Sequence, residues 1–279
     1  MPSGTLRLIL RQGRVEVHYA VDADNCSTSP CGEVEIGIDK GYSEVFIDSE
    51  GDGHGDGLGD LLSSESDSLK IKYQRRNKLK AIAEAKPNKA ETKVSNNLRR
   101  KKLDRRQQLH TKRVRDRVFK AVHSVVDKAK TIVCEDLSSP ITSKNQKRRL
   151  SGWVKGLIQE ALESVSQRRG SSLVLVNCAY TSQMDSRHDV LLGHRDGEKF
   201  YCFDGVVLHA DQNAARNILA RKDDSEIQLW TSFEKVRSIL LERTESFKKR
   251  MGLLIQDSSC SGQQLLLFPL STESELLFN

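Results

Sequence analysis

Short apolar runs that alternate with helical segments limit the folds that this chain can adopt. Residues 33–39, 131–134 and 172–177 are brief and rich in Val, Ile or Leu, a pattern typical of buried strands. Helical patterns occupy residues 150–169 and 209–219, one between two of these runs and one after the last. Strands that alternate with helices in this way predict an α/β fold built in layers.

Two further segments show the two-residue alternation of β-structure. Residues 5–22 alternate apolar and polar side chains on both sides of residues 12–13, Gln-Gly, which predicts a hairpin. Residues 43–47 predict a strand that follows the first buried strand after a tight turn. Further helices are expected at residues 64–85, 90–130 and 225–250.

Two of the expected helices carry apolar stripes. The stripe of the helix at residues 90–130 consists of Val114, Val118, Val122 and Val125, and predicts packing on the sheet with the basic face outward. In the helix at residues 150–169, Trp153 belongs to the stripe and is expected in the core. Stacking of Trp153 and Tyr73 on nucleic-acid bases is the alternative.

Residues 48–60 are rich in Gly and Asp and have the composition of a calcium loop. Counting Asp48 as position 1 puts Gly59 at position 12, where an EF-hand has a bidentate Glu. The segment is therefore predicted to be a flexible turn between a strand and a helix.

Basic charge is concentrated in one part of the chain. Residues 70–130 hold 22 Lys and Arg against 5 Asp and Glu, a balance of +17, whereas the whole chain carries +7. This density predicts a nucleic-acid partner whose counterions are released on binding. A solvated helix face or a disordered basic arm is the alternative. The candidate phosphate-binding side chains are Arg75, Arg76, Arg99, Arg100, Lys101, Lys102, Arg105 and Arg106.

Composition excludes several other classes of protein. No stretch approaches the roughly 20 apolar residues of a membrane-spanning helix, so no membrane partner is expected. The first residues lack the apolar core of a secretory signal. The 6 Cys are too sparse for a disulfide scaffold, which indicates a reduced, cytoplasmic setting, with nucleoid association if the partner is DNA.

Three acids stand at the ends of predicted elements. Asp39 and Glu135 each end an apolar strand, and Asp211 begins a helix. Carboxylates that converge beside apolar residues repel one another and need a cation, and Mg²⁺ or Mn²⁺ suits such hard oxygen ligands. Two such ions can support phosphodiester hydrolysis. Three unrelated carboxylates are the alternative that spacing alone leaves open.

Four motifs resemble the RuvC-like nuclease half of the TnpB (OrfB-type) family, whose members are transposon-encoded relatives of type V CRISPR effectors. They are Gly37-Ile38-Asp39-Lys40-Gly41, Val133-Cys134-Glu135-Asp136-Leu137, Asn177-Cys178-Ala179-Tyr180-Thr181-Ser182-Gln183 and Ala210-Asp211-Gln212-Asn213-Ala214-Ala215-Arg216-Asn217-Ile218. The resemblance covers about residues 33–221. It implies an RNase H-like (RuvC-like) α/β fold, a mixed sheet flanked by helices with a long basic helical insertion. It also implies that Asp39, Glu135 and Asp211 are the catalytic acids, with Asp39 bridging two metal ions.

The chain departs from the family pattern in two places. Where the family has a zinc ribbon with two Cys pairs, this chain has Asp185, His188, Cys202 and Asp204, so we expect a degenerate ribbon whose hairpin persists without zinc. Phe200, Tyr201, Phe203, Val206 and Val207 are candidates for a replacement core. Most of the N-terminal half of the family is also missing, which suggests a fragment, a mis-assigned start or a decayed copy.

The resemblance implies that residues 1–32 are the remnant of an N-terminal β-barrel with a linker, and that residues 33–183 form the nuclease core with the basic insert 64–130. Residues 184–208 would form the degenerate ribbon and residues 209–221 the third acidic motif. Residues 222–279 would form a C-terminal helix and tail. The implied function is metal-dependent DNA endonuclease activity directed by a guide RNA. A nucleic-acid-binding protein without cleavage, from a truncated or repurposed element, is the alternative. A transposase that joins DNA ends is a weaker one.

Overall fold

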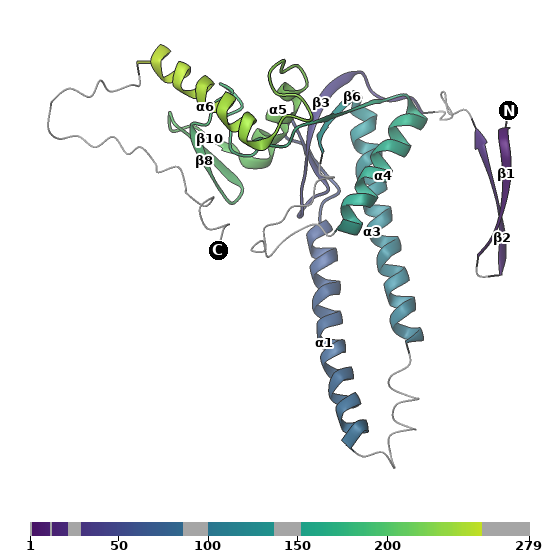
Figure 1. Ribbon diagram of the computed structural model, residues 1–279. Coiled ribbons are helices and arrows are strands. Elements are labelled where there is room, and N and C mark those ends of the chain that lie inside the picture. The colour runs from purple at the N-terminus through teal and green to yellow at the C-terminus, as the bar shows by residue number, and fades with distance from the viewer. Residues whose placement is uncertain (1, 12, 22–28, 86–99, 137–151, 253–279) are drawn as a thin grey trace.

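The computed structural model describes residues 2–11, 13–21, 29–85, 100–136 and 152–252 (Figure 1). Its strands are β1 (Pro2–Arg11), β2 (Arg14–Val21), β3 (Val34–Lys40), β4 (Phe46–Asp48), β5 (Gly53–His54), β6 (Ala129–Glu135), β7 (Ser172–Val176), β8 (Gly193–Asp196), β9 (Lys199–Cys202) and β10 (Val207–His209). Its helices are α1 (Leu58–Ala85), α3 (Lys101–Lys128), α4 (Gly152–Arg169), α5 (Ala210–Arg221) and α6 (Phe233–Arg250). Among these helices, none is long and apolar enough to cross a membrane.

The central sheet has five strands in the order β5-β4-β3-β6-β7. Strand β4 runs antiparallel to β3 and to β5, whereas β6 runs parallel to β3 and β7 parallel to β6. An antiparallel meander extended by two parallel strands is the mixed sheet that the RNase H-like prediction requires. The fold prediction is confirmed.

Helices cover the two faces of this sheet unequally. Ile36 and Ile38 of β3 lie in a core cluster with the valine stripe of α3 and with the apolar face of α4. On the other face, Ile218 of α5 packs against Val133 and Val176. Because successive side chains of a strand point to opposite faces, residues 37 and 39 of β3 point toward α5.

Helix α5 approaches β3 more closely than side chains usually allow. A Cβ atom added to Gly37 would meet the backbone oxygen of Ala215 and the side chain of Leu219. Arg216 holds the helix in place by donating from Nε to the carbonyl oxygen of Ser49, at 3.1 Å. The backbone N–H of Gly37 donates to the Ser49 hydroxyl at 3.3 Å. The lack of a side chain at Gly37 therefore permits a direct contact between α5 and β3.

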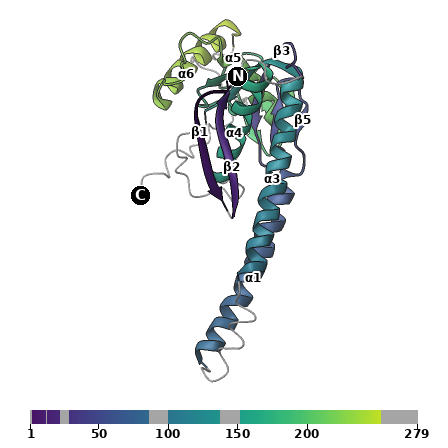
Figure 2. The ribbon, with the colours of Figure 1, turned by 90° about the vertical axis from the view of Figure 1, so that its right-hand side faces the viewer.

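The long helices α1 and α3 extend side by side away from the sheet as an arm (Figures 1 and 2). Only the sheet end of α3 carries its buried residues, which include all four valines of the predicted stripe. Arg106 of α3 clamps the arm by a bidentate ion pair with Glu65 of α1, with 2.6 Å between Nη2 and Oε2. Arg106, predicted to bind phosphate, thus joins the two helices.

The structure corrects several local predictions. The segment 48–60 is not simply a flexible turn, because it contains β5 and the first residues of α1, and the side chain of Asp48 is fully buried. Trp153 is not in the core, since 46% of its surface is exposed. Of the expected replacement core, Phe200 is fully buried, but Val206 and Val207 are exposed. Arg99 lies outside the described residues.

The predicted N-terminal hairpin is present as β1 and β2, which pair antiparallel. Leu8 lies opposite Val17 and Leu10 opposite Val15, so these side chains share one face of the ribbon. That face is exposed, and Figure 1 shows the hairpin set apart from the central sheet. Its origin in a β-barrel remains a prediction.

Replacing Gly37 with Ala tests the close contact between α5 and β3. We expect Gly37→Ala to lower the free energy of unfolding by about 1–3 kcal/mol, because a methyl group there must displace backbone. Gly156→Ala is the matched control, since its added Cβ meets no atom within 4 Å in the interior of α4 and should stabilise by ~0.5–1 kcal/mol. Urea unfolding measures both, and equal effects of the two substitutions would contradict the contact.

Candidate active site

Asp39 and Glu135 lie side by side at the carboxyl ends of adjacent parallel strands. Ile38 of β3 is in register with Cys134 of β6, so the next residue of each strand, Asp39 and Glu135, projects from the same edge of the sheet. Both point toward α5, because Ile38 and Cys134 point into the opposite core. The strand register therefore brings together two of the three acids that the sequence predicts.

The third acid reaches the same place from the other layer. Asp211 is the second residue of α5, and α5 packs across β3 and β6. Asn213 and Asn217 anchor this helix on its far side by donating to the carbonyl oxygen of Met184, at 2.6 and 2.9 Å. The position of Asp211 thus follows from the contact at Gly37 on one side and from these amide hydrogen bonds on the other.

The electrostatics show that the three carboxyl groups interact. Burial, followed by the nearby charges of Glu135 and Asp211, raises the pKa of Asp39 to about 8, and the charge of Arg195 partly offsets the rise. Burial raises the pKa of Glu135 as well, although the charges of Lys40 and Lys155 oppose it. Both residues keep some exposed surface while their carboxyl groups are surrounded by protein. Such a cluster holds excess negative potential that a cation would relieve.

A guanidinium from the ribbon, that of Arg195, forms an ion pair with one of these acids. Arg195 of β8 donates from Nη2 to Oδ1 of Asp211 at 2.6 Å, and both side chains are partly exposed. Lys40 turns away from the carboxyl groups and donates to the backbone oxygen of Glu135 at 3.0 Å. Sequence reasoning missed Arg195, because nothing in the pattern of β8 shows that the hairpin folds back over α5.

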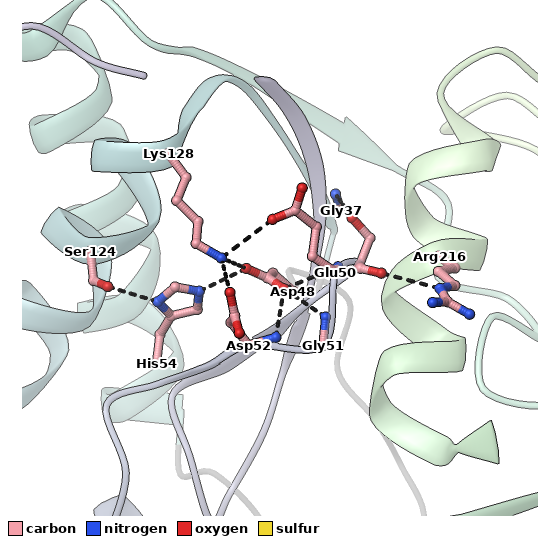
Figure 3. A network of polar contacts seen from close by, with 10 residues as sticks. Gly37, Asp48, Glu50, Gly51, Asp52, His54, Ser124, Lys128 and Arg216 are labelled. Atoms are coloured by element: carbon pink, nitrogen blue, oxygen red, sulfur yellow. Dashed lines mark hydrogen bonds and ion pairs between the residues drawn. The ribbon is translucent and has the colours of Figure 1, made fainter. Parts of the chain in front are cut away.

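A second acidic group lies beside β4, where ligand atoms of Asp48, Glu50 and Asp52 are within 4.8 Å of one another. Figure 3 shows that the ammonium of Lys128 lies among these side chains. Its Nζ atom is 2.8 Å from Oδ2 of Asp48 and 3.4 Å from Oε2 of Glu50, and it also forms an ion pair with Asp52. Burial opposes ionisation of Asp48, but hydrogen bonds from Lys128 and His54 outweigh it and lower the pKa of this carboxyl. The Lys128 ammonium thus occupies the place where a metal ion would bind. The ion pairs and hydrogen bonds of Asp48 join β4 and β5 to the C-terminal end of α3.

The positions of the missing zinc ligands are joined by an arginine. Arg187 donates to both carboxylate oxygens of Asp185, at 3.0 and 2.7 Å, and to both oxygens of Asp204, at 2.9 Å each. Cys202 is hydrogen-bonded to Asp185, whereas His188 packs against the rings of Phe203 and Phe247. The ion pairs join Asp185 to Asp204, two of the four positions where the sequence predicts a degenerate zinc site. Arg187 is a residue that the motif comparison overlooked.

The predicted phosphate-binding residues lie along the arm. Arg75 and Arg76 are on α1, Arg100 precedes α3, and the remainder are on α3 itself. All the described members except Arg76 and Arg106 are exposed. The arm therefore presents a basic surface on the part of α1 and α3 that lies away from the sheet.

Comparison with known proteins matches residues 156–218 to the family described as Cas12f1-like, TNB domain. The matched segment runs from α4 through the ribbon to α5, and includes the third motif with Asp211. The resemblance to the TnpB family is confirmed. No curated protein matches the chain.

Solved structures of RNA-guided effectors are also similar in part. Alicyclobacillus acidoterrestris C2c1, solved in complex with single-guide RNA, has 19% identity and a TM-score of 0.31, with 44% of this chain and 16% of that chain covered. The mini-RNA-guided endonuclease CRISPR-Cas phi3 has 21% identity and a TM-score of 0.33, with 47% and 22% covered. The chain spans less than a quarter of either protein.

Replacing Arg187 tests its structural role in the ribbon. We expect Arg187→Met to cost about 2–4 kcal/mol, because it leaves the buried carboxylate of Asp185 without its partner. The exposed pair of Arg115 and Glu160 supplies the control, and Arg115→Met should cost under ~1 kcal/mol. Thermal unfolding with and without a zinc chelator measures both, and a loss of stability caused by the chelator would contradict an arginine-held ribbon.

The same pair gives a pH dependence. Hydrogen bonds from Arg187 lower the pKa of Asp204 to about 2, and the pKa of Asp185 is lowered as well. A carboxyl whose pKa is lowered by folding stabilises the protein above its unfolded pKa of ~3.9, and this contribution is lost as the pH falls toward 2. The stability difference between wild type and Arg187→Met should therefore be constant from pH 5 to 8 and shrink between about pH 4 and 2.

Proposed function

We propose that this chain forms the nuclease part of an RNA-guided DNA endonuclease and hydrolyses phosphodiester bonds at Asp39, Glu135 and Asp211. The observation that carries the proposal is the strand register, which sets Asp39 beside Glu135 on the face that α5 covers with Asp211. The similarity of residues 156–218 to the Cas12f1-like TNB domain supports it. The basic arm supports a nucleic-acid partner, for which a guide RNA and target DNA are the proposed components.

The residues present fit Mg²⁺ or Mn²⁺. Their donors are carboxylate oxygens, which these ions prefer, and burial together with the charges of Glu135 and Asp211 raises the pKa of Asp39. Asp39, Glu135 and Asp211 would hold these ions. Two divalent ions at such a site activate water and stabilise the leaving oxygen.

The other side chains have roles that do not depend on the metal. Arg195 holds Asp211 by donating to its Oδ1 and would offer its guanidinium to the phosphate of a bound strand. Lys40 holds the end of β6 through the Glu135 carbonyl. Exposed arginines and lysines of the arm would hold the phosphate backbone without reading sequence, and the guide would read sequence by base pairing.

A second function, nucleic-acid binding without cleavage, is favoured by one observation. The Arg195 guanidinium neutralises Asp211 and would compete with a metal ion for the same oxygen. In that case the acids would be structural, and the arm alone would define the activity.

Changing Asp39 to Asn separates the two functions. We expect Asp39→Asn to reduce Mg²⁺-dependent cleavage of single-stranded DNA at least ~10³-fold, since removal of an essential catalytic group has effects of this order. Binding of DNA in a gel-shift assay should be unchanged. Glu35→Gln on the same strand is the control, because Glu35 is exposed and pairs with Lys222 far from the acids. Undiminished cleavage by Asp39→Asn would place the nuclease site elsewhere.

Metal binding should depend on pH because Asp39 has a pKa of about 8 before a cation arrives. At pH 7 the metal-free carboxyl is mainly protonated, so binding a cation must release this proton. The affinity for Mn²⁺ should therefore rise about tenfold per pH unit below pH 8 and level off above it. Calorimetry in buffers of different ionisation enthalpy counts the protons, and an affinity independent of pH from 6 to 8 would contradict this electrostatic account.

A further inference from the structure

A cavity of about 840 Å³ lies between α1 and the N-terminal half of α3, and Trp153 of α4 forms part of its wall. Its volume falls in the range of about 300–1,000 Å³ that ligand-binding pockets occupy. None of the three predicted catalytic acids lines it, so the cavity is separate from the candidate active site.

The wall of the cavity combines apolar and aromatic side chains. Leu62 and Leu69 of α1 face it together with Leu103 of α3. Two aromatic rings, those of Tyr73 and Trp153, also line it, and each residue is about half exposed, at 50% and 46%. A tryptophan that lies on an apolar stripe but keeps nearly half of its surface exposed leaves part of its indole accessible to a ligand in the cavity.

The polar side chains restrict the chemistry of that ligand. Arg76, Lys80 and Arg100 stand at the cavity and belong to the basic surface of the arm, although Lys80 also approaches Glu84 at 3.8 Å. Asn77 and Gln107 offer amide groups that can both donate and accept hydrogen bonds. Two carboxylates, those of Glu65 and Asp104, also line the cavity, and Glu65 is paired with Arg106. Aromatic rings, amides and both signs of charge suit a planar heterocycle that offers hydrogen-bond donors and acceptors, and not an apolar helix or an acyl chain.

We propose that the cavity between α1 and α3 binds an unpaired nucleobase of a single-stranded nucleic acid, with the base stacked on Trp153. This site rests on the proposed function only in requiring a nucleic-acid partner, and it does not require cleavage. Tyr73 forms a second aromatic wall, and the cations of the arm hold the flanking phosphates. The arm would then bind single strands in preference to duplexes, because bases that are paired in a duplex cannot enter the cavity.

The chain offers a direct optical test, because it has 2 Trp, Trp153 and Trp230. In full-length Trp230→Phe, Trp153 is the only indole, and a base stacked on it quenches its fluorescence. The probes are single-stranded DNA and RNA 12-mers of the same sequence, the corresponding DNA duplex, and an abasic 12-mer with the same number of phosphates. EDTA is present throughout, so that the nuclease site contributes nothing.

We expect quenching by at least one of the two single strands, and none by the duplex or the abasic strand at concentrations where they bind. Quenching by RNA alone would identify guide-type RNA as the natural ligand, and quenching by DNA alone a displaced DNA strand. Equal quenching by the abasic strand, or no quenching by either base-bearing strand at saturation, would overturn the proposal.

Substitution of the ring gives a second, independent readout. Trp153→Leu keeps an apolar, helix-compatible side chain but removes the stacking surface, and should weaken single-strand binding about tenfold or more while leaving abasic binding unchanged. Trp230→Leu is the matched control, since Trp230 is 85% exposed and does not line the cavity. Equal binding by the two variants would refute the stacking role. If Trp153 is quenched by single strands but the wild-type protein does not cleave DNA in Mg²⁺, only the nuclease site is refuted.

Discussion

The contact between α5 and β3 at Gly37 determines the geometry on which the rest of the site depends. Because the helix backbone lies directly against the strand, the first turn of α5 is held over the carboxyl ends of β3 and β6. Asp211 therefore lies near enough to Asp39 for its charge to raise the pKa of that carboxyl, although the ligand atoms of the three acids do not all lie within 4.8 Å of one another. Gly37 makes the close approach of the helix possible, and Asn213 and Asn217 fix the helix to the carbonyl oxygen of Met184.

Three acidic groups of the described residues each meet a cation from another part of the chain. Arg195 of the ribbon meets Asp211, Arg187 joins Asp185 to Asp204, and Lys128 of α3 lies among the acids beside β4. Two of these arrangements contain a fully buried carboxylate, which makes their partners structural. The pair at Asp211 is more exposed, and the neighbouring Asp39 and Glu135 have raised pKa values, so of these three groups it is the one that a further cation would stabilise.

Sequence patterns predicted the features that depend on local periodicity. They failed where the position of a side chain depends on contact with an element distant in sequence. The valine stripe of α3, the buried strands and the acids at strand ends follow from alternation and helical spacing. Strand β5 has only two residues, too few for alternation to reveal. Trp153 belongs to the apolar stripe of α4, but it lies in the first turn of that helix, which faces α1 and α3 and not the sheet. Arg187 and Arg195 could not be inferred, because their partners are far away in sequence or replace metal ligands.

The central claim is that Asp39, Glu135 and Asp211 together form the metal site of a nuclease. Anomalous scattering from crystals of the full chain soaked in Mn²⁺ tests it most directly. The account predicts Mn²⁺ coordinated by Asp39 and Glu135, with Asp211 released from Arg195 to join them. Mn²⁺ found only among Asp48, Glu50 and Asp52, or no ordered Mn²⁺ beside Asp39 at saturating concentration, would contradict it.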